Sequence, residues 1–197
     1  MDRPGPNQCI DRVFLLDVSG SMESCWDDTI GGFNAFLADQ KATGGTLTLI
    51  QFDHEYQVTC ECTKIDDVKP LTRETYKPRG STALLDAIGR LVKDWKGTSN
   101  PSVVILTDGL ENSSHKFTKA HIKDLIEAKT KDGWTFAYLG ANQDAFAEAG
   151  SLGIAPGCTM NYDGNKTPEA FTRLSAAVSS QASGQSQTVD LSQPHTV

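Results

Sequence analysis

The sequence has no run of about 18 apolar residues, the length that a membrane-spanning helix requires. Cations are in the minority, since 18 Lys and Arg stand against 25 Asp and Glu, a formal net charge of −7. A nucleic-acid-binding protein needs a surplus of cations to contact phosphates. These absences argue against a membrane span and against a general nucleic-acid binder.

Cysteine is scarce, and the five residues are odd in number and scattered along the 197 positions. Such a set is typical of a reducing compartment, in which disulfides do not form. The opening residues, MDRPGPNQ, also lack the apolar stretch of a secretory signal peptide. Both observations predict a cytoplasmic location.

Several enzyme signatures are missing as well. The chain contains no GxSxG nucleophile motif, no Walker phosphate loop and no GxGxxG dinucleotide motif. The four histidines show neither metal-ligand spacing nor a nucleophile–base pattern. The sequence therefore argues against an α/β-hydrolase and against a nucleotide-dependent enzyme.

What the chain does contain is a series of short β-rich runs. Residues 13–18 (VFLLDV) and 103–106 (VVIL) are apolar almost throughout, as in strands that helices cover on both faces. Residues 46–52 and 134–139 predict two more strands. The run 56–62 follows 46–52 after only three residues, which forces antiparallel pairing and places it at a sheet edge.

Amphipathic helices alternate with these strands. Leu85, Ile88, Val92 and Trp95 step by three, four and three, which places them on one face of a helix. Similar spacing predicts further helices near residues 30–37, 122–126, 144–149 and 167–178. The predicted fold is therefore α/β, a doubly wound (Rossmann-like), mostly parallel sheet with one antiparallel edge strand.

Polar residues cluster next to the predicted strands. Asp17, Ser19 and Ser21 end the first strand in DVSGS, Asp108 follows the strand 103–106 in TDG, and Thr82 precedes a helix in GST. In doubly wound sheets, ligands bind at the carboxyl ends of the strands, where the strand order reverses, so we expect these side chains to converge. Carboxylates and hydroxyls without imidazole or thiol select a hard cation, Mg²⁺ by preference, with Mn²⁺ or Ca²⁺ as alternatives.

DVSGS, the Thr of GSTALLDA and TDG, in this order, resemble the metal-ion-dependent adhesion site (MIDAS) of the von Willebrand factor A (vWA) domain family. The resemblance implies that Ser19 and Ser21 ligate the metal directly. It implies direct or water-mediated ligation by Thr82. Asp17 and Asp108 are then expected to act mainly through water, with Asp17 also orienting the serines.

The resemblance covers roughly residues 10–180, which we expect to form the vWA domain. Residues 1–9 are expected to be a flexible lead, and the Ser- and Gln-rich residues 181–197 a flexible tail. In the resembled family, the dication keeps a water that the Asp or Glu of a partner protein replaces. The resemblance thus implies a metal-dependent adaptor without catalytic activity, most similar to stand-alone bacterial or viral adaptors.

Two other functions stay open. A metal-dependent hydrolase or phosphatase would use the same ion to activate water. The chain shows no firm general base for this, and DVSGS lacks the second aspartate that aspartyl-phosphate enzymes place two residues after the first. The third hypothesis is a scaffold protein whose metal site is no longer important for function and whose partner contacts lie elsewhere.

Individual residues keep a second interpretation. Thr82 is also suited to cap a helix, and Asp108 to stabilise a turn. Glu111 and Asn112 either line the metal face or form a solvated loop. Trp26 either anchors a partner or packs over the core.

The remaining candidates are less specific. Cys60 and Cys62 stand two apart in a predicted strand and are expected to face the same way, without the second ligand pair that a zinc site needs. Asp190 is a candidate carboxylate ligand from the tail. Further candidates for a rim that selects the partner are Met22, His54, Arg79 and Asn142.

Overall fold

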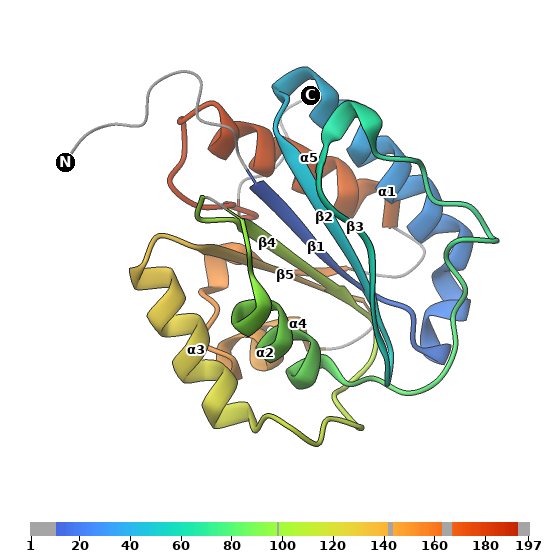
Figure 1. Ribbon diagram of the computed structural model, residues 1–197, viewed down its shortest axis with the longest axis vertical. Coiled ribbons are helices and arrows are strands. Elements are labelled where there is room, and N and C mark those ends of the chain that lie inside the picture. The colour runs from blue at the N-terminus through green and yellow to red at the C-terminus, as the bar shows by residue number, and fades with distance from the viewer. Residues whose placement is uncertain (1–10, 98, 142–143, 163–166, 193–197) are drawn as a thin grey trace.

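The computed structural model describes residues 11–97, 99–141, 144–162 and 167–192 (Figure 1). Over these ranges the chain forms a six-stranded sheet in the order β3-β2-β1-β4-β5-β6. Neighbouring strands run parallel except β2 and β3, which are antiparallel. The predicted α/β fold is confirmed. The strands are β1 (Asp11–Asp17), β2 (Thr46–Phe52), β3 (Tyr56–Lys64), β4 (Ser102–Thr107), β5 (Thr135–Ala141) and β6 (Thr159–Tyr162).

Helices cover both faces of the sheet (Figure 1). Alternate residues of β1 point to opposite faces, so Phe14 and Leu16 pack in the layer of α1 and α5, whereas Val13 and Leu15 pack in the layer of α2, α3 and α4. No helix within the described ranges has the length and apolar character needed to cross a membrane. The helices are α1 (Trp26–Gln40), α2 (Leu84–Asp94), α3 (Lys119–Lys131), α4 (Ala145–Ser151) and α5 (Thr167–Ala182).

Strand β6 was not predicted from the sequence. It has only four residues, and Asn161 in the middle of them is exposed. Strand propensity and apolar alternation are too weak over so short an edge strand to distinguish it from a loop. Its pairing with β5 places it in the sheet.

A bulge interrupts β3. The register shifts between the pairs Leu47/Thr63 and Leu49/Cys60, and Cys62 has a positive φ of 43°. Cys60 packs partly against the core, while Cys62 is exposed and donates its backbone N–H to the Thr48 hydroxyl. The expectation that the two cysteines face the same way was wrong, because the extra residue breaks the two-residue alternation.

The segment after α5 is partly packed. Val189 and Leu191 are 0% and 2% exposed and belong to the core layer of α1 and α5. The backbone N–H of Leu191 donates to the Gly157 carbonyl at 2.7 Å, and the Arg173 guanidinium donates to the Leu191 carbonyl at 2.5 Å. This packing differs from the flexible tail expected from residue 181, because two apolar side chains within a polar stretch find a place in the core. The expected lead at residues 1–9 lies outside the described residues.

Candidate metal centre

The candidate centre lies where the loops after β1 and β4 meet. These strands are parallel neighbours, with Leu16 opposite Leu106, so their carboxyl ends lie side by side. The chain proceeds from β1 outward to β2 on one side and from β4 outward to β5 on the other. The strand order therefore reverses between β1 and β4, which is the place where ligands bind in such sheets.

Asp17 is the buried base of the centre. It is 0% exposed, and its two oxygens accept hydrogen bonds from the Ser19 backbone N–H at 2.6 Å and the Thr107 hydroxyl at 2.5 Å. Burial raises the pKa of Asp17 to about 6, although both hydrogen bonds act to lower it. Asp17 therefore joins the β1 loop to the end of β4 and leaves a buried anion that a cation would stabilise.

Ser19, Ser21 and Asp108 form a chain of side-chain contacts. The hydroxyl oxygens of Ser19 and Ser21 are 3.1 Å apart, and Ser21 donates to an Asp108 carboxylate oxygen at 2.6 Å. Desolvation also raises the pKa of Asp108, which the hydrogen bond from Ser21 acts to lower. The loops after β1 and β4 thus share a direct side-chain contact between Ser21 and Asp108.

Gly109 marks the point at which the hydroxyls converge. A Cβ added there would lie 2.7 Å from Thr82 Oγ1, 3.3 Å from Ser21 Oγ and 3.5 Å from Ser19 Oγ. Three hydroxyl oxygens from two separate loops therefore surround one small volume that only a glycine leaves free. All five predicted site residues are brought together.

Thr82 is positioned by its backbone. Its N–H donates to Asn112 Oδ1 at 2.9 Å, and its carbonyl accepts from the N–H groups of Asn112 and Ser113 at 3.0 and 3.1 Å. The N-cap residue of α2 is Ala83, and Glu111 accepts from the N–H of Leu85 in place of a local cap. The Thr82 hydroxyl is therefore not used for capping. It forms no hydrogen bond with any other described residue.

Glu111 and Asn112 make hydrogen bonds within the structure, so they do not form a simply solvated loop. The Glu111 carboxylate also accepts from the N–H groups of Ser113 and Ser114 and from the Ser114 hydroxyl. With the Asn112 contact to Thr82, these bonds join the loop after β4 to the start of α2. The two residues position the third segment of the centre.

Sequence reasoning missed Asp53, which follows β2 directly. Asp53 is buried, accepts from Arg79 Nε at 2.8 Å, and through its carbonyl accepts from the N–H of Ala83 at 2.9 Å. Gly80, with a φ of +67°, lies against the side chains of Asp53 and His54. These contacts hold the loop that carries Thr82. The signal in the sequence was an acidic residue at the carboxyl end of an apolar strand, where Asp17 and Asp108 also stand.

The expected rim is only partly at the surface. Met22 is buried in the core, so its assignment to the rim was wrong. Trp26 is half-buried, donates its indole N–H to the Tyr76 carbonyl at 2.7 Å and carries the Arg73 guanidinium 4.7 Å above its ring. Its main role is therefore to close the core. His54 is exposed.

The last two candidates are Asn142 and Asp190. Asn142 lies outside the described residues. Asp190 accepts from the backbone N–H and the hydroxyl of Ser192 at 2.9 and 2.6 Å. The neighbouring Leu191 bonds to Gly157, which precedes β6, so Asp190 is remote from the carboxyl ends of β1 and β4. Asp190 therefore does not reach the candidate centre.

The donor set fits a hard cation. Among the described residues, no group of three or more His, Cys, Asp or Glu side chains is arranged to hold a metal. The predicted set depends on hydroxyls, with Asp17 and Asp108 as its two carboxylates. Converging oxygen donors over a buried anion are the chemistry that Mg²⁺, Mn²⁺ or Ca²⁺ requires.

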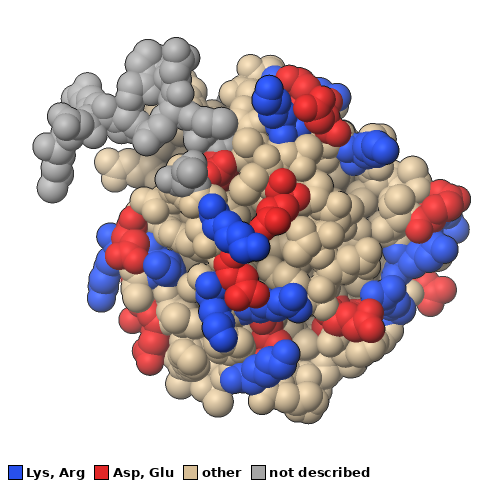
Figure 2. Space-filling view, in the orientation of Figure 1, with Lys and Arg blue, Asp and Glu red and all other residues tan. Residues whose placement is uncertain are grey.

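A groove of about 990 Å³ adjoins the centre between β3, α2 and residues 116–117. Acidic and basic side chains alternate over this face of the molecule (Figure 2). Asp86 in the groove is already bonded to the N–H groups of His115, Lys116 and Phe117. Three acids and three Lys or Arg line the groove, so it has no charge preference of its own. Its charged lining residues are Glu55, Asp86, Asp94, Arg90, Lys93 and Lys116.

Comparison with known proteins places the chain in a family. The family profile described as "von Willebrand factor type A domain" matches residues 12–111. The chain belongs to this family, whose members are protein-interaction modules. A search of curated proteins found no significant match.

Solved structures share the fold at low identity. The vWF domain of the type V pili tip protein Mfa5 from Porphyromonas gingivalis has a TM-score of 0.67 and 12% identity, over 96% of this chain and 98% of that one. The ArnB paralog VWA2 from Sulfolobus acidocaldarius has a TM-score of 0.65 and 16% identity, over 85% and 45%.

A third relative holds a metal. Proximal thread matrix protein 1 from the mussel byssus, with a zinc-occupied MIDAS motif, has a TM-score of 0.60 and 14% identity, over 84% and 47%. The chain spans about half the length of this matrix protein and of VWA2. At such identities the likeness shows the fold alone. The neighbours include adhesion, pilus and matrix proteins.

Proposed function

We propose that this chain is a metal-dependent protein-binding adaptor. The proposed ligand set, through side-chain oxygens, is Asp17, Ser19, Ser21, Thr82 and Asp108. The cation is Mg²⁺ by preference, with Mn²⁺ or Ca²⁺ as alternatives, and when bound it supplies an electrophilic site for an Asp or Glu carboxylate of a partner protein. The observation that carries the proposal is the convergence of three hydroxyl oxygens beside Gly109.

The residues of the chain have separate roles. Ser19, Ser21 and Thr82 offer neutral oxygens, which cancel little of the charge of a dication. Asp17 holds the β1 loop through Ser19 and the β4 strand through Thr107. Asp108 orients Ser21. A partner carboxylate would therefore supply the negative charge that the neutral hydroxyls do not provide to the dication.

Binding is better supported than hydrolysis. Both oxygens of Asp17 are already engaged in hydrogen bonds, which suits positioning more than proton transfer. A pilus tip protein and a pilus adhesin among the structural neighbours are consistent with a binding role. We also propose a reducing, cytoplasmic location, which the four described cysteines support because all are free.

Thermal melting with and without metal tests the proposal. A ligand that binds only the folded state raises its stability by about 2.7 kcal/mol at 100 times its Kd. We expect the melting midpoint to rise when Mg²⁺ replaces EDTA, and Ser21→Ala to lose the rise. Ser24→Ala, an exposed serine three residues away, should keep it. Unchanged midpoints with Mg²⁺, Mn²⁺ and Ca²⁺ would contradict the proposal.

A second experiment separates binding from catalysis. Affinity capture with and without EDTA should yield a partner that the chelator releases. Metal-dependent turnover of a generic phosphoester that Ser21→Ala abolishes would instead favour the hydrolase.

A further inference from the structure

The loop after β4 turns its polar side chains inward and its apolar side chain outward. Leu110 is 59% exposed, although it stands between Gly109 and Glu111 beside the hydroxyls. Glu111 bonds to Leu85 and to its own loop, and Asn112 bonds to Thr82. Hydrogen bonds therefore fix the loop to Thr82, just before α2, and to Leu85, in the first turn of α2. Leu110 is exposed from a well-anchored backbone.

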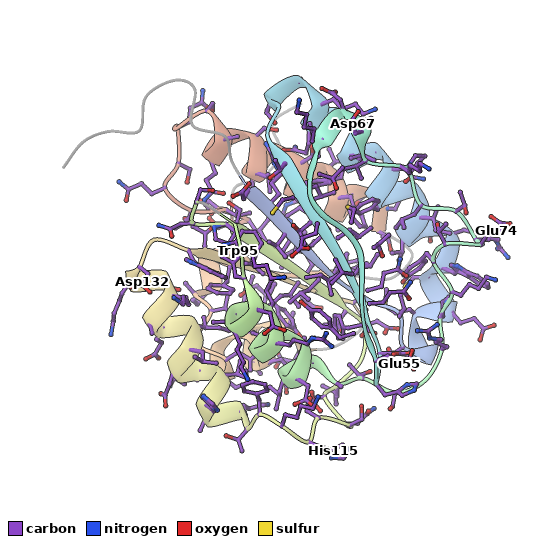
Figure 3. All side chains as sticks on the ribbon, in the orientation of Figure 1. Glu55, Asp67, Glu74, Trp95, His115 and Asp132 are labelled. Carbon is purple, nitrogen blue, oxygen red and sulfur yellow. The ribbon has the colours of Figure 1, made fainter. Side chains whose placement is uncertain are left out.

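A second exposed apolar side chain follows the neighbouring strand of the sheet. The exposed large hydrophobic residues in the described part of the chain are Val58, Leu110 and Phe146. Leu110 follows β4 by three residues and Phe146 follows β5 by five, and these strands are parallel neighbours. We call Leu110 and Phe146 the apolar rim. Figure 3 shows Glu55 and His115, from the loops that follow β2 and β4, at one end of the molecule, and Asp67 at the other.

The segment after β1 carries three acidic residues and faces one Arg, Arg73. The 3₁₀ segment that follows β1 and the start of α1 carry Glu23, Asp27 and Asp28 around one hollow. Asp27 is paired with Arg73, while Glu23 is exposed. A partner segment with several acids in a row would meet like charges at this segment. An apolar neighbour of the acid would instead meet Leu110, which follows Gly109 directly.

We propose that Leu110 forms the apolar half of a two-part docking surface. The occupant is a partner segment in which a single acidic residue stands next to a large apolar residue. The inference rests on the proposed function, since the acid is the group captured at the metal centre. Consecutive Cα atoms are about 3.8 Å apart, so Leu110 begins one residue from the point where the hydroxyls converge. An apolar side chain one or two positions from the acid lies within its reach.

Model peptides test the proposal on the full chain with saturating Mg²⁺. The probes are acetyl-GGLDGG-amide, acetyl-GGDLGG-amide and acetyl-GGGDGG-amide, titrated by NMR. We expect at least one leucine peptide to bind about five-fold more tightly than the glycine peptide. This ratio should fall to about one in Leu110→Ser.

Val58→Ser is the matched control, because β3 lies three strands from β4, roughly 14 Å at 4.8 Å per strand. It should keep the preference, and Mg²⁺ affinity measured by calorimetry should be the same in all three proteins. Equal, EDTA-sensitive binding of the three peptides would overturn the role of Leu110 and leave the proposed function standing. Mg²⁺ binding without metal-dependent binding of any peptide would overturn both.

Discussion

Replacing Gly109 by Ala is the sharpest test of the candidate centre. The new methyl group would lie 2.7 Å from Thr82 Oγ1 and 3.3 Å from Ser21 Oγ, in the volume that the hydroxyls surround. Gly109 is not one of the glycines with a positive φ, so an alanine at this position does not strain the backbone. The cost to the metal-free protein is that of overpacking, about 1–3 kcal/mol. The main effect should be on metal binding.

Wild-type protein at 100 times its Kd for Mg²⁺ gains about 2.7 kcal/mol. For a chain of this size, 1 kcal/mol corresponds to about 2–4 °C, so the midpoint should rise by roughly 5–11 °C. Gly109→Ala should abolish this rise in a thermal melt with and without EDTA. The control is Gly31→Ala in α1, where an added Cβ meets nothing within 4 Å. It should gain about 0.5–1 kcal/mol and keep the full metal response. An undiminished Mg²⁺ response in Gly109→Ala would refute the reasoning.

Three further predictions concern the residues around the centre and the core. Asp53→Asn should lower the free energy of unfolding by about 2 kcal/mol and the Mg²⁺ affinity several-fold in calorimetry, because the loop before α2 loses its buried ion pair with Arg79. Glu55 is the exposed partner of Arg79, so Glu55→Gln should lower the free energy of unfolding by less than about 1 kcal/mol. Asp86 is partly buried, which acts to raise its pKa, but three backbone N–H groups lower the pKa below its ordinary value. The ionised side chain therefore stabilises the fold by about 1 kcal/mol at pH values above its ordinary pKa of 3.8, and this stabilisation is lost as the pH falls through the lowered pKa. In urea unfolding, the difference in free energy of unfolding between Asp86→Asn and the wild type should shrink at acid pH. A difference that stays constant would contradict this prediction. Leu191→Ala should lower the free energy of unfolding in urea by about 2–4 kcal/mol, because Leu191 is buried. The exposed Ser183→Ala should change it by no more than about 0.5 kcal/mol. Equal effects of the two substitutions would show that the segment after α5 is not packed.

The sequence predicted the elements whose cause is local. The apolar runs of β1 and β4 are buried on both faces, and the periodic apolar residues of α2 form its buried side, so pattern and burial agree. The five candidate site residues could be selected because each stands at a strand end or just before a helix, where chain topology alone brings loops together.

What the sequence missed depends on contacts between distant segments. Asp53 gains its role only because Arg79, 26 residues away, reaches it, and Glu111 caps a helix that begins 27 residues earlier. Val189 and Leu191 are two apolar residues in a polar stretch, too few to produce a periodic pattern. Their burial is decided by the shape of the core they enter.

The hydrogen bonds between Thr82 and residues 112–113 have a consequence for engineering. Because main-chain groups supply five of the six ends of these three bonds, the two loops cannot be exchanged or lengthened one at a time. Transplanting this binding face onto another parallel sheet requires residues 79–83 and 107–114 to be moved together, with Asp53 and with residues 17–21, which carry the remaining proposed ligands. Variation among designed versions should therefore be sought at Leu110, an exposed position in these ranges whose side chain takes no part in the hydrogen bonds between the two loops.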